Sequence, residues 1–403
     1  MTDPAPVREL GPADRPAVDR MISLAFGGRS PRTEPEPFPA GVTALGIDGP
    51  EGDLAASLLL REDAIALGAG SVRCGGIAGL SVHPGHRGQG HFGALLREAL
   101  ARSTARGDAF SMLYPSHQGI YRRLGYQTVA QVRRYVLPLA DLQGIRTDPS
   151  LRISPVLAAD MPALRALYLA MAHRENALLL REGPLFGDDG LPAAPWNAVI
   201  VRDGTSAPRG YLSYARTADG VGGTGLEVFD LVGEDRAALE ALLSWLGSWS
   251  TVVSSALVRT RTEDPLLDVL PGAGLRPDPR TVPLVMMRLL DTAAALEART
   301  APPGLEGEVH LEVEDAAVPE GVCRAAGVRA VRVRSGRVEV LPAGSSPLPR
   351  TRLDVHAAAL LLAGGRTLAE ARRLGLRADA DPAAEAFLDT LLAGPRPSVL
   401  DFF

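Results

Sequence analysis

The sequence predicts an α+β protein made of three successive segments, residues 1–140, 150–299 and 304–403. Each of the first two segments contains an apolar strand that runs directly into an amphipathic helix, and the third begins with strands and ends with helices. Prolines and a glycine in Thr300–Gly304 mark a linker before the third segment. A chain of 403 residues also exceeds what one ordinary core organises, so two or three domains are expected.

Composition limits the class of protein and its partners. Hydrophobic residues make up 46% of the chain and charged residues 22%, as in ordinary globular domains. The apolar runs, such as residues 357–363, are far shorter than the ~20 residues of a membrane span, and the N-terminus lacks a secretory pattern. We therefore expect a cytoplasmic protein with no membrane partner. The net charge of −5 argues against a nucleic-acid partner and favours cationic substrates.

Cysteine and histidine usage predicts neither a disulfide nor a metal site. Cys74 and Cys323 lie far apart in the sequence, and free thiols are favoured over a disulfide. The seven histidines lack the spacing of metal ligands, so no metal is expected.

The first segment begins with a helix and two strands. Asp14 is placed to cap a helix whose apolar face lies within residues 18–26. Strands are expected near residues 41–48 and 53–68, and residues 127–139 are expected to extend the same domain.

The most informative part of the chain is a strand, a glycine-rich loop and a helix within residues 77–100. The loop consists of Arg87, Gly88, Gln89 and Gly90, and the helix that follows has apolar residues at Phe92, Leu95, Leu96 and Leu100. Such a loop directs backbone N–H groups towards one point at the positive end of a helix, which suits phosphate oxygens. The loop alone also fits a tight strand-to-helix turn, and its spacing matches neither a P-loop nor a dinucleotide fingerprint.

A second motif supports the phosphate interpretation. A short strand is expected at residues 110–114, and residues 116–126 read SHQGIYRRLGY. Together with VHPGHRGQG at residues 82–90, this pattern resembles the GCN5-related N-acetyltransferase (GNAT) superfamily. In that superfamily a [QR]xxGx[GA] motif binds the pyrophosphate of acetyl-CoA, and a later tyrosine lies near the CoA sulfur.

The match to these motifs is close but not complete. Arg87 and Gly90 match the pyrophosphate motif, and Tyr121 matches the tyrosine. Phe92 departs from the family, which usually has a small residue at that position. Tyr126, by contrast, is expected to serve in packing.

The second segment repeats the pattern of the first. ADRPAV at residues 13–18 recurs as ADMPAL at residues 159–164, each time where an amphipathic helix begins. Residues 226–232 indicate a strand that leads into a helix, but the loop between them, residues 233–236, reads GEDR. Its two carboxylates would repel phosphates at the helix N-terminus. We infer a degenerate second GNAT fold that has lost CoA.

The third segment is expected to hold strands within residues 308–342, a hairpin turn at residues 334–337 and an apolar helix within 353–364. A capping box is expected at Thr367, and a last helix at 382–393. The order of two GNAT folds, a small α+β domain and an aromatic C-terminus resembles the Eis ("enhanced intracellular survival") family. The resemblance implies a sterol-carrier-like third domain, a homohexamer and acetylation of amines on aminoglycosides, lysine side chains or peptides.

The resemblance also assigns roles in the transfer of acetyl from acetyl-CoA to an amine. Tyr121 would protonate the CoA sulfur, and the α-carboxylate of Phe403 would accept the proton of the amine. The residues expected to hold CoA are Leu80, Val82, Arg87, Gly88, Gln89, Gly90 and Ser116, with a backbone N–H of the Leu80–Val82 strand as oxyanion donor. Two consecutive phenylalanines at residues 402 and 403 argue against a frayed end, since exposing both to water is unfavourable.

The substrate remains open at this stage. Asp401, Glu34 and Glu36 could make a cleft acidic, although each is better interpreted as a solvated surface carboxylate. An aminoglycoside-type amine is favoured, and the alternatives are a protein lysine, a polyamine, or a non-enzymatic protein that binds acyl-CoA or lipid. For the third domain, a structural role that docks the C-terminal tail is favoured over sterol binding.

Overall fold

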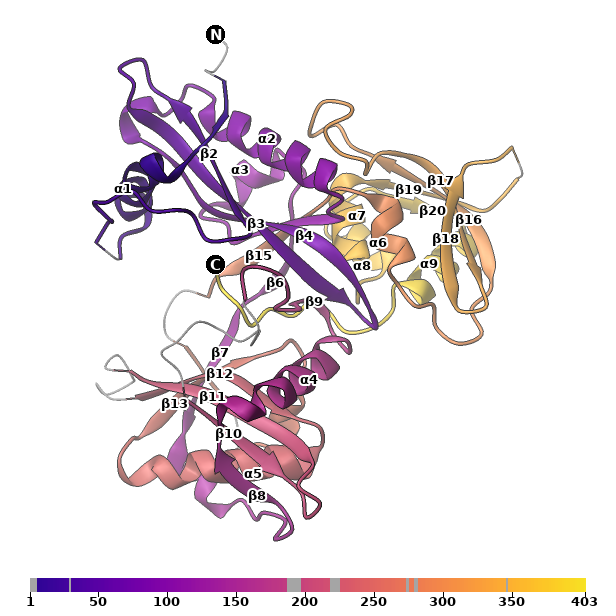
Figure 1. Ribbon diagram of the computed structural model, residues 1–403. Coiled ribbons are helices and arrows are strands. Elements are labelled where there is room, and N and C mark those ends of the chain that lie inside the picture. The colour runs from indigo at the N-terminus through magenta and orange to yellow at the C-terminus, as the bar shows by residue number, and fades with distance from the viewer. Residues whose placement is uncertain are drawn as a thin grey trace.

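The described residues of this computed structural model form three β-sheets, and each sheet belongs mainly to one predicted segment (Figure 1). The structure describes residues 6–28, 30–186, 197–217, 225–272, 275–278, 282–345 and 347–403. The predicted α+β class is confirmed. Within the same residues, no helix is both long and apolar enough to cross a membrane.

The first sheet has the strand order β1-β2-β3-β4-β5-β15-β6, and β9 pairs with β3. Its strands are β1 (Arg8–Glu9), β2 (Val42–Asp48), β3 (Leu54–Leu67), β4 (Gly70–Val82), β5 (Phe110–Leu113), β6 (Gln127–Gln131), β9 (Asn176–Leu179) and β15 (Leu284–Leu289). The accompanying helices are α1 (Arg15–Phe26), α2 (His91–Arg106) and α3 (Gln118–Arg122). One face of the sheet buries its side chains against α2, and the other against α1 and the C-terminal helices.

The second sheet has the order β14-β7-β13-β12-β11-β10-β8. Its strands are β7 (Arg133–Pro138), β8 (Arg152–Pro155), β10 (Asn197–Arg202), β11 (Pro208–Thr217), β12 (Gly225–Gly233), β13 (Ser255–Thr260) and β14 (Arg276–Pro277), with helices α4 (Met161–Ala172) and α5 (Arg236–Gly247). β12 and β13 are parallel and are joined through α5, just as β4 and β5 are parallel and joined through α2. The predicted internal repeat is therefore a repeat of topology.

The repeated helix start has the same geometry in both copies, although it differs from the expected cap. The carboxylate of Asp14 accepts the backbone N–H of Gly11 at 2.9 Å instead of capping α1. Asp160 accepts the N–H of Leu157 at 2.8 Å in the same way before α4. Each aspartate thus closes the short turn that precedes its helix.

The two GNAT-like sheets exchange strands. The expected strand at residues 127–139 divides at Val132, and its halves β6 and β7 belong to different sheets. In return, β15 from the second half of the chain inserts between β5 and β6. Neither sheet is complete without sequence from the other, so the sheets do not separate at residue 140.

The third sheet has the order β18-β17-β16-β19-β20. Its elements are β16 (Gly307–Glu314), β17 (Gly327–Arg334), β18 (Arg337–Pro342), β19 (Arg350–Asp354), β20 (Ala378–Ala380), α6 (Thr292–Glu297), α7 (Val355–Leu362), α8 (Leu368–Arg373) and α9 (Pro382–Leu391). The expected hairpin turns at Ser335 and Gly336, whose φ angles are 52° and 75°. The capping box at Thr367 is present as expected.

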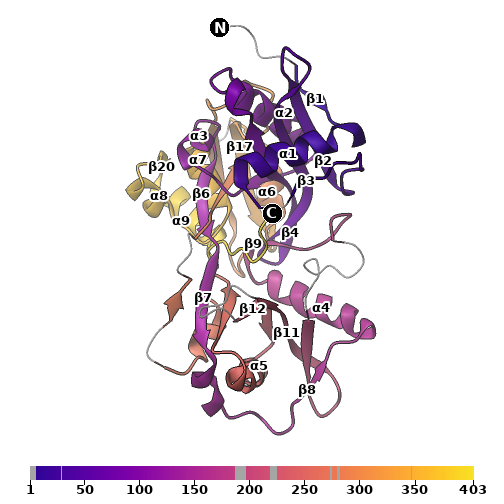
Figure 2. The same ribbon diagram turned by 90° about the vertical axis from the view of Figure 1, so that its left-hand side faces the viewer.

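The third domain shares a hydrophobic core with the first sheet. α7 packs against β15 and β6, and both views place it beside that sheet (Figures 1 and 2). One continuous set of buried side chains joins Phe110 and Met287 of the first sheet to Leu311 of β16 and Leu361 of α7. The third domain therefore supports the face of the first sheet that lies opposite α2.

Candidate active site

The parallel strands β4 and β5 diverge near the motif loop. They pair over four positions, from Cys74 with Phe110 to Ile77 with Leu113. β5 then ends, whereas β4 continues to Val82 through Gly79, which has a φ of 56°. The stretch of β4 that carries Leu80 and Val82 therefore lies beyond its last pair with β5.

The glycine-rich loop leads from β4 directly into α2. Gly88 and Gly90 have φ angles of 82° and 85°, a left-handed conformation that glycine adopts at little cost. Gly90 is the N-cap residue of α2, and among the described residues no side chain caps this helix. Its first backbone N–H groups remain available to an anion, as the sequence predicts for a phosphate-binding loop.

The side chains of the loop reinforce this arrangement. Arg87 is exposed, which leaves its guanidinium accessible from solvent. The side-chain oxygen Oε1 of Gln89 lies 3.2 Å from Nε2 of His91, the first residue of α2. Burial, together with the nearby His86, lowers the pKa of His91, so this contact is made by a neutral imidazole at neutral pH.

Tyr121 lies on α3 beneath the start of α2. Its side chain is 5% exposed, and its ring packs edge-on against Phe92 with centroids 5.3 Å apart. The side chain of Ser116 lies near the Tyr121 hydroxyl. Burial raises the pKa of Tyr121, and the nearby Ser116 side chain only partly offsets this effect. The departure at Phe92 therefore has a local structural role, because its ring holds Tyr121.

Tyr126 belongs to the core, as expected. It is fully buried, and its hydroxyl lies 2.7 Å from Oγ of Ser111. Cys74 and Cys323 are both free thiols, in agreement with the sequence prediction.

The last residues of the chain lie against β4 and β5. The guanidinium carbon of Arg61 lies 4.3 Å from the centroid of the Phe403 ring. A Cβ atom at Gly76 would stand 3.1 Å from that ring, so the absence of a side chain in β4 allows this close approach. Phe403 is half-buried, whereas Phe402 remains 59% exposed. Phe403 is therefore docked against the protein, whereas the side chain of Phe402 is mostly exposed to solvent.

Tyr114 receives the C-terminal segment and was not singled out from the sequence. It directly follows β5, and its ring packs against the rings of Phe402 and Phe403 with centroids 4.5 and 5.2 Å apart. Its hydroxyl donates to the backbone carbonyl of Asp401. Its position in the sequence could have indicated this role, because Tyr114 follows the end of β5, next to the motif-bearing strand β4.

The acidic candidates have different environments. Glu34 and Glu36 are exposed, as interpreted, and Glu36 pairs with Arg32 at 2.5 Å. The interpretation of Asp401 as a solvated carboxylate is wrong, since its side chain is only 12% exposed and pairs with Arg181 at 3.1 Å. The segment folds back between the GNAT-like sheets, which brings Asp401 to a buried partner.

The loop of the second GNAT-like domain is closed to phosphate. Asp235 is the N-cap of α5 and accepts the backbone N–H of Ala238 at 2.9 Å. Arg209 pairs with both Asp235 and Glu234. The helix N-terminus that would attract an anion is therefore occupied by the Asp235 carboxylate, which agrees with a degenerate copy.

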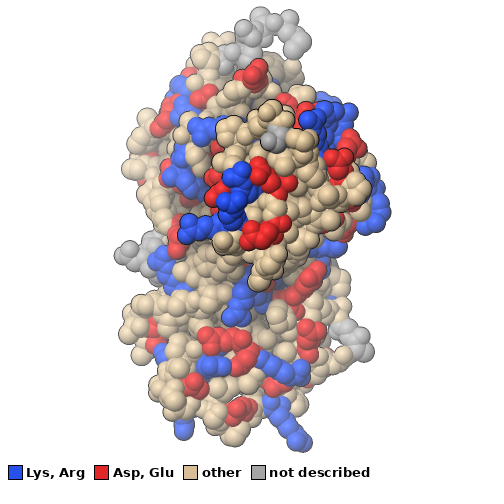
Figure 3. Space-filling view, turned by 90° about the vertical axis from the view of Figure 1, so that its right-hand side faces the viewer, with Lys and Arg blue, Asp and Glu red and all other residues tan. Residues whose placement is uncertain are grey.

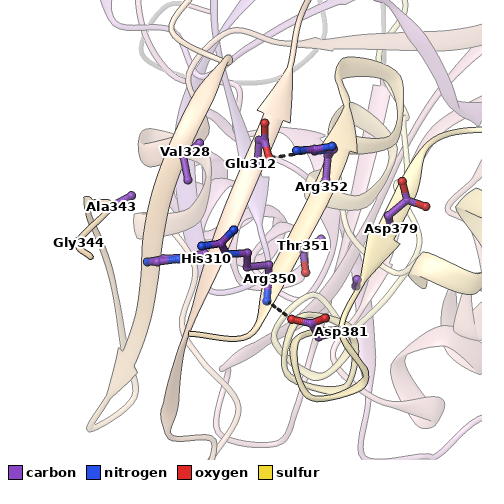
Figure 4. Close-up of a pocket in the computed structure, with 11 residues that line it drawn as sticks. His310, Glu312, Val328, Ala343, Gly344, Arg350, Thr351, Arg352, Asp379 and Asp381 are labelled. Carbon is purple, nitrogen blue, oxygen red and sulfur yellow. Dashed lines mark hydrogen bonds and ion pairs between the residues drawn. The ribbon is translucent and has the colours of Figure 1, made fainter. Parts of the chain in front are cut away.

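The third domain carries a pocket of about 550 Å³ on its sheet. The lining includes His310, Glu312, Arg350, Arg352, Asp379 and Asp381 (Figure 4). Nε of Arg352 donates to a carboxylate oxygen of Glu312 at 2.9 Å. Acidic and basic side chains also intermix over the face that carries this domain (Figure 3). A charged pocket of this kind is a poor match for a sterol, which favours the structural interpretation of the domain.

Comparison with known proteins assigns a domain type to each of three parts of the chain. Residues 6–129 and 178–289 match two models that each describe an acetyltransferase (GNAT) domain, and residues 292–400 match a sterol carrier protein domain. The fold and site thus define a chain of tandem GNAT domains followed by a sterol-carrier-type domain.

Particular relatives support the same conclusion. An uncharacterized N-acetyltransferase of Streptomyces coelicolor is 30% identical over 271 residues, and the match spans 62% of this chain and 63% of that protein. The crystal structure of a GCN5-related N-acetyltransferase from Kribbella flavida is 26% identical, covers 98% of both chains and has a TM-score of 0.81. The crystal structure of Eis1 from Mycobacterium abscessus is 23% identical and has a TM-score of 0.72. The match covers 98% of this chain and 100% of the Eis1 chain. The predicted likeness to the Eis fold is confirmed, and the GNAT matches support an acetyltransferase.

Proposed function

We propose that this chain is an acetyl-CoA-dependent N-acetyltransferase that acts on primary amines of a cationic small molecule, with an aminoglycoside-type substrate favoured. One observation carries the proposal. The anion-ready loop follows β4, the buried Tyr121 packs against Phe92 in the helix after that loop, and Phe403 is docked beside Gly76 of the same strand.

The phosphates of CoA would bind the backbone N–H groups of the Arg87–Gly90 loop, with Arg87 supplying positive charge. The thioester end would lie along Leu80 and Val82, past the last pair of β4 with β5. Ser116, whose side chain lies near the Tyr121 hydroxyl, would face the same end of the cofactor.

The reaction forms a C–N bond and breaks a C–S bond. The neutral amine attacks the thioester carbonyl, a backbone N–H of β4 stabilises the oxyanion, and the thiolate leaves. Tyr121 donates its phenolic proton to that sulfur, and its raised pKa keeps it protonated at neutral pH. The proton lost by the amine passes to the α-carboxylate of Phe403.

The two proposed groups lie on different faces of the first sheet. Tyr121 packs with α2 and the side chains on that face. Phe403 packs with the side chains on the opposite face, next to Arg61. This arrangement supports a reaction in which cofactor and amine approach from opposite sides.

The test is acetyl-CoA turnover, followed by thiol release, with an aminoglycoside, a linear polyamine and a lysine peptide assayed side by side. Tyr121→Phe should lower kcat by about 10²-fold while CoA binding persists, and Tyr214→Phe in the second domain should retain activity. Residues appended after Phe403 should also suppress transfer. Normal transfer by both altered proteins would refute the mechanism, and CoA binding without transfer to any amine would favour a binding protein.

Assembly and location are further proposals. The resemblance implies a homohexamer, which native mass spectrometry would test, and the composition favours the cytoplasm, which fractionation would test. Acetylation confined to the lysine peptide or the polyamine would replace the aminoglycoside-type substrate with that alternative.

A further inference from the structure

Arg181 joins the second GNAT domain to the C-terminal segment. It is 2% exposed, and its Nη1 and Nη2 atoms donate to the two carboxylate oxygens of Asp230, each at 2.8 Å. Its Nε lies 3.1 Å from both carboxylate oxygens of Asp401. One guanidinium therefore bridges a fixed carboxylate of β12 and a carboxylate two residues before Phe403.

The Asp230 end of this bridge is rigid. Asp230 is fully buried in β12, accepts the hydroxyl of Tyr211 at 3.2 Å, and has its own N–H bonded to Ser213. The ring of Tyr168 lies under the guanidinium carbon of Arg181 at 4.0 Å. Arg181 has a φ of 52°, an unfavourable conformation that its surroundings must maintain.

The charges explain why the bridge binds the tail. Arg181 and Asp230 together are neutral, and the Nε donor would remain buried without a partner if Asp401 were absent. Burial lowers the pKa of Arg181, but Asp230 and Asp401 raise it more, so the guanidinium stays charged. A carboxylate at residue 401 satisfies that donor.

Further bonds hold the same segment on its way to the bridge. The backbone carbonyl of Asn176 accepts the backbone N–H of Ser398 at 2.8 Å. Thr262 donates to the carbonyl of Pro397 at 2.9 Å, and Arg259 donates to the carbonyl of Leu400 at 3.1 Å. These partners lie at the start of β9 and in or just after β13, so residues 397–401 lie along the junction of the two GNAT-like domains.

We propose that the second GNAT domain, whose own phosphate loop is closed, serves to hold the C-terminal segment at the site of the first domain, with Arg181 as the positioning residue. This inference rests on the proposed function, in which Phe403 accepts the proton of the amine. Arg181 touches neither CoA nor amine and acts through Asp401. It places Phe403 beside Gly76 while Tyr114 orients the carbonyl of Asp401.

The test changes the tail rather than the buried bridge, so that folding is preserved. In Asp401→Asn the segment should lose its ionic anchor, and kcat should fall about 10- to 100-fold with KM for acetyl-CoA unchanged. Asp401→Glu should recover part of kcat. Asp160→Asn is the matched control, because Asp160 has a similarly covered side chain (17% exposed) that pairs with Arg202 in the same domain. Its kcat should remain at the wild-type value.

Backbone hydrogen exchange of residues 395–403 measures whether the segment is docked, independently of enzyme activity. The segment should be protected in the wild type and in Asp160→Asn, and should exchange faster in Asp401→Asn. Unchanged kcat in Asp401→Asn, or reduced kcat with an equally protected tail, would overturn the inference. If the wild-type protein transfers no acetyl group, the proposed function fails, and the exchange rates still decide whether the second domain holds the tail.

Arg181→Lys provides an independent check. A lysine keeps the charge but lacks the fork that reaches two carboxylates at once. It should therefore reproduce the kcat loss of Asp401→Asn and add little to it in the double variant. Equal and additive losses would refute a shared action of the two residues.

Discussion

The ring of Phe92 packs edge-on against the ring of Tyr121, with centroids 5.3 Å apart. Phe92 is the second residue of the helix that follows the phosphate-type loop, and Tyr121 is the proposed acid. The helix that follows the loop therefore contacts the proposed acid through an aromatic pair. This contact suggests how binding of CoA phosphates and placement of the phenol are coupled.

Phe92→Ala should lower kcat about 2- to 10-fold, because an aromatic pair contributes about 0.5–1.5 kcal/mol beyond its buried area. Steady-state kinetics would measure this effect. Phe38→Ala serves as a control, since Phe38 is also half-buried but packs near α1 and Arg15. Equal losses in the two variants would show that Phe92 has no particular role at Tyr121.

Gly90→Ala should weaken CoA binding about 5- to 30-fold, because alanine in a left-handed conformation costs about 1–2 kcal/mol and moves the N–H groups of the loop. Titration calorimetry with CoA would measure it. Gly68→Ala is the matched control, because Gly68 also has a positive φ (60°) and open space around its Cα. If both variants bind CoA equally, the loop does not hold the phosphates.

Gly76→Ala should displace Phe403. The new Cβ would stand 2.6 Å from a carboxylate oxygen of Asp63 and 3.1 Å from the Phe403 ring, so kcat should fall while CoA affinity holds. Overpacking of this kind costs about 1–3 kcal/mol of stability, which thermal unfolding would report. The control is Gly75→Ala, whose Cβ would meet Ser103 and Asp108 on the opposite face. A kcat that falls equally in both variants would contradict a role for Phe403.

The pH dependence of kcat should show no loss from Tyr121 below about pH 10. Burial raises the folded-state pKa of this phenol, so the protonated, proton-donating form persists further into the alkaline range than in a free tyrosine. Initial rates at saturating acetyl-CoA would test this. A falling limb centred near about pH 8 would be incompatible with Tyr121 as the acid.

Much of the candidate site could be predicted from local sequence. The loop at Arg87–Gly90 depends on glycine conformation and on the adjacent helix start, and both are encoded within a few residues. Likewise, the carboxylates at Glu234 and Asp235 were sufficient to predict that the second loop would not bind phosphate. Tyr114 escaped notice because its role depends on contact with Asp401, 287 residues away.

The sequence by itself therefore determined the three-part α+β division and the candidate cofactor loop, because periodicity and turn chemistry act over short distances, and its motifs carried the resemblance to GNAT and sterol-carrier-type domains. Tertiary structure alone decided the exchange of β7 and β15 between the sheets. Many apolar strands could form the same backbone hydrogen bonds at a sheet edge, so local sequence does not select among them. Tertiary structure also decided the docking of the tail. Arg181 precedes Asp230 by 49 residues and Asp401 by 220. These charged groups pair because the fold buries them at one junction, where an unpaired charge would be unfavourable.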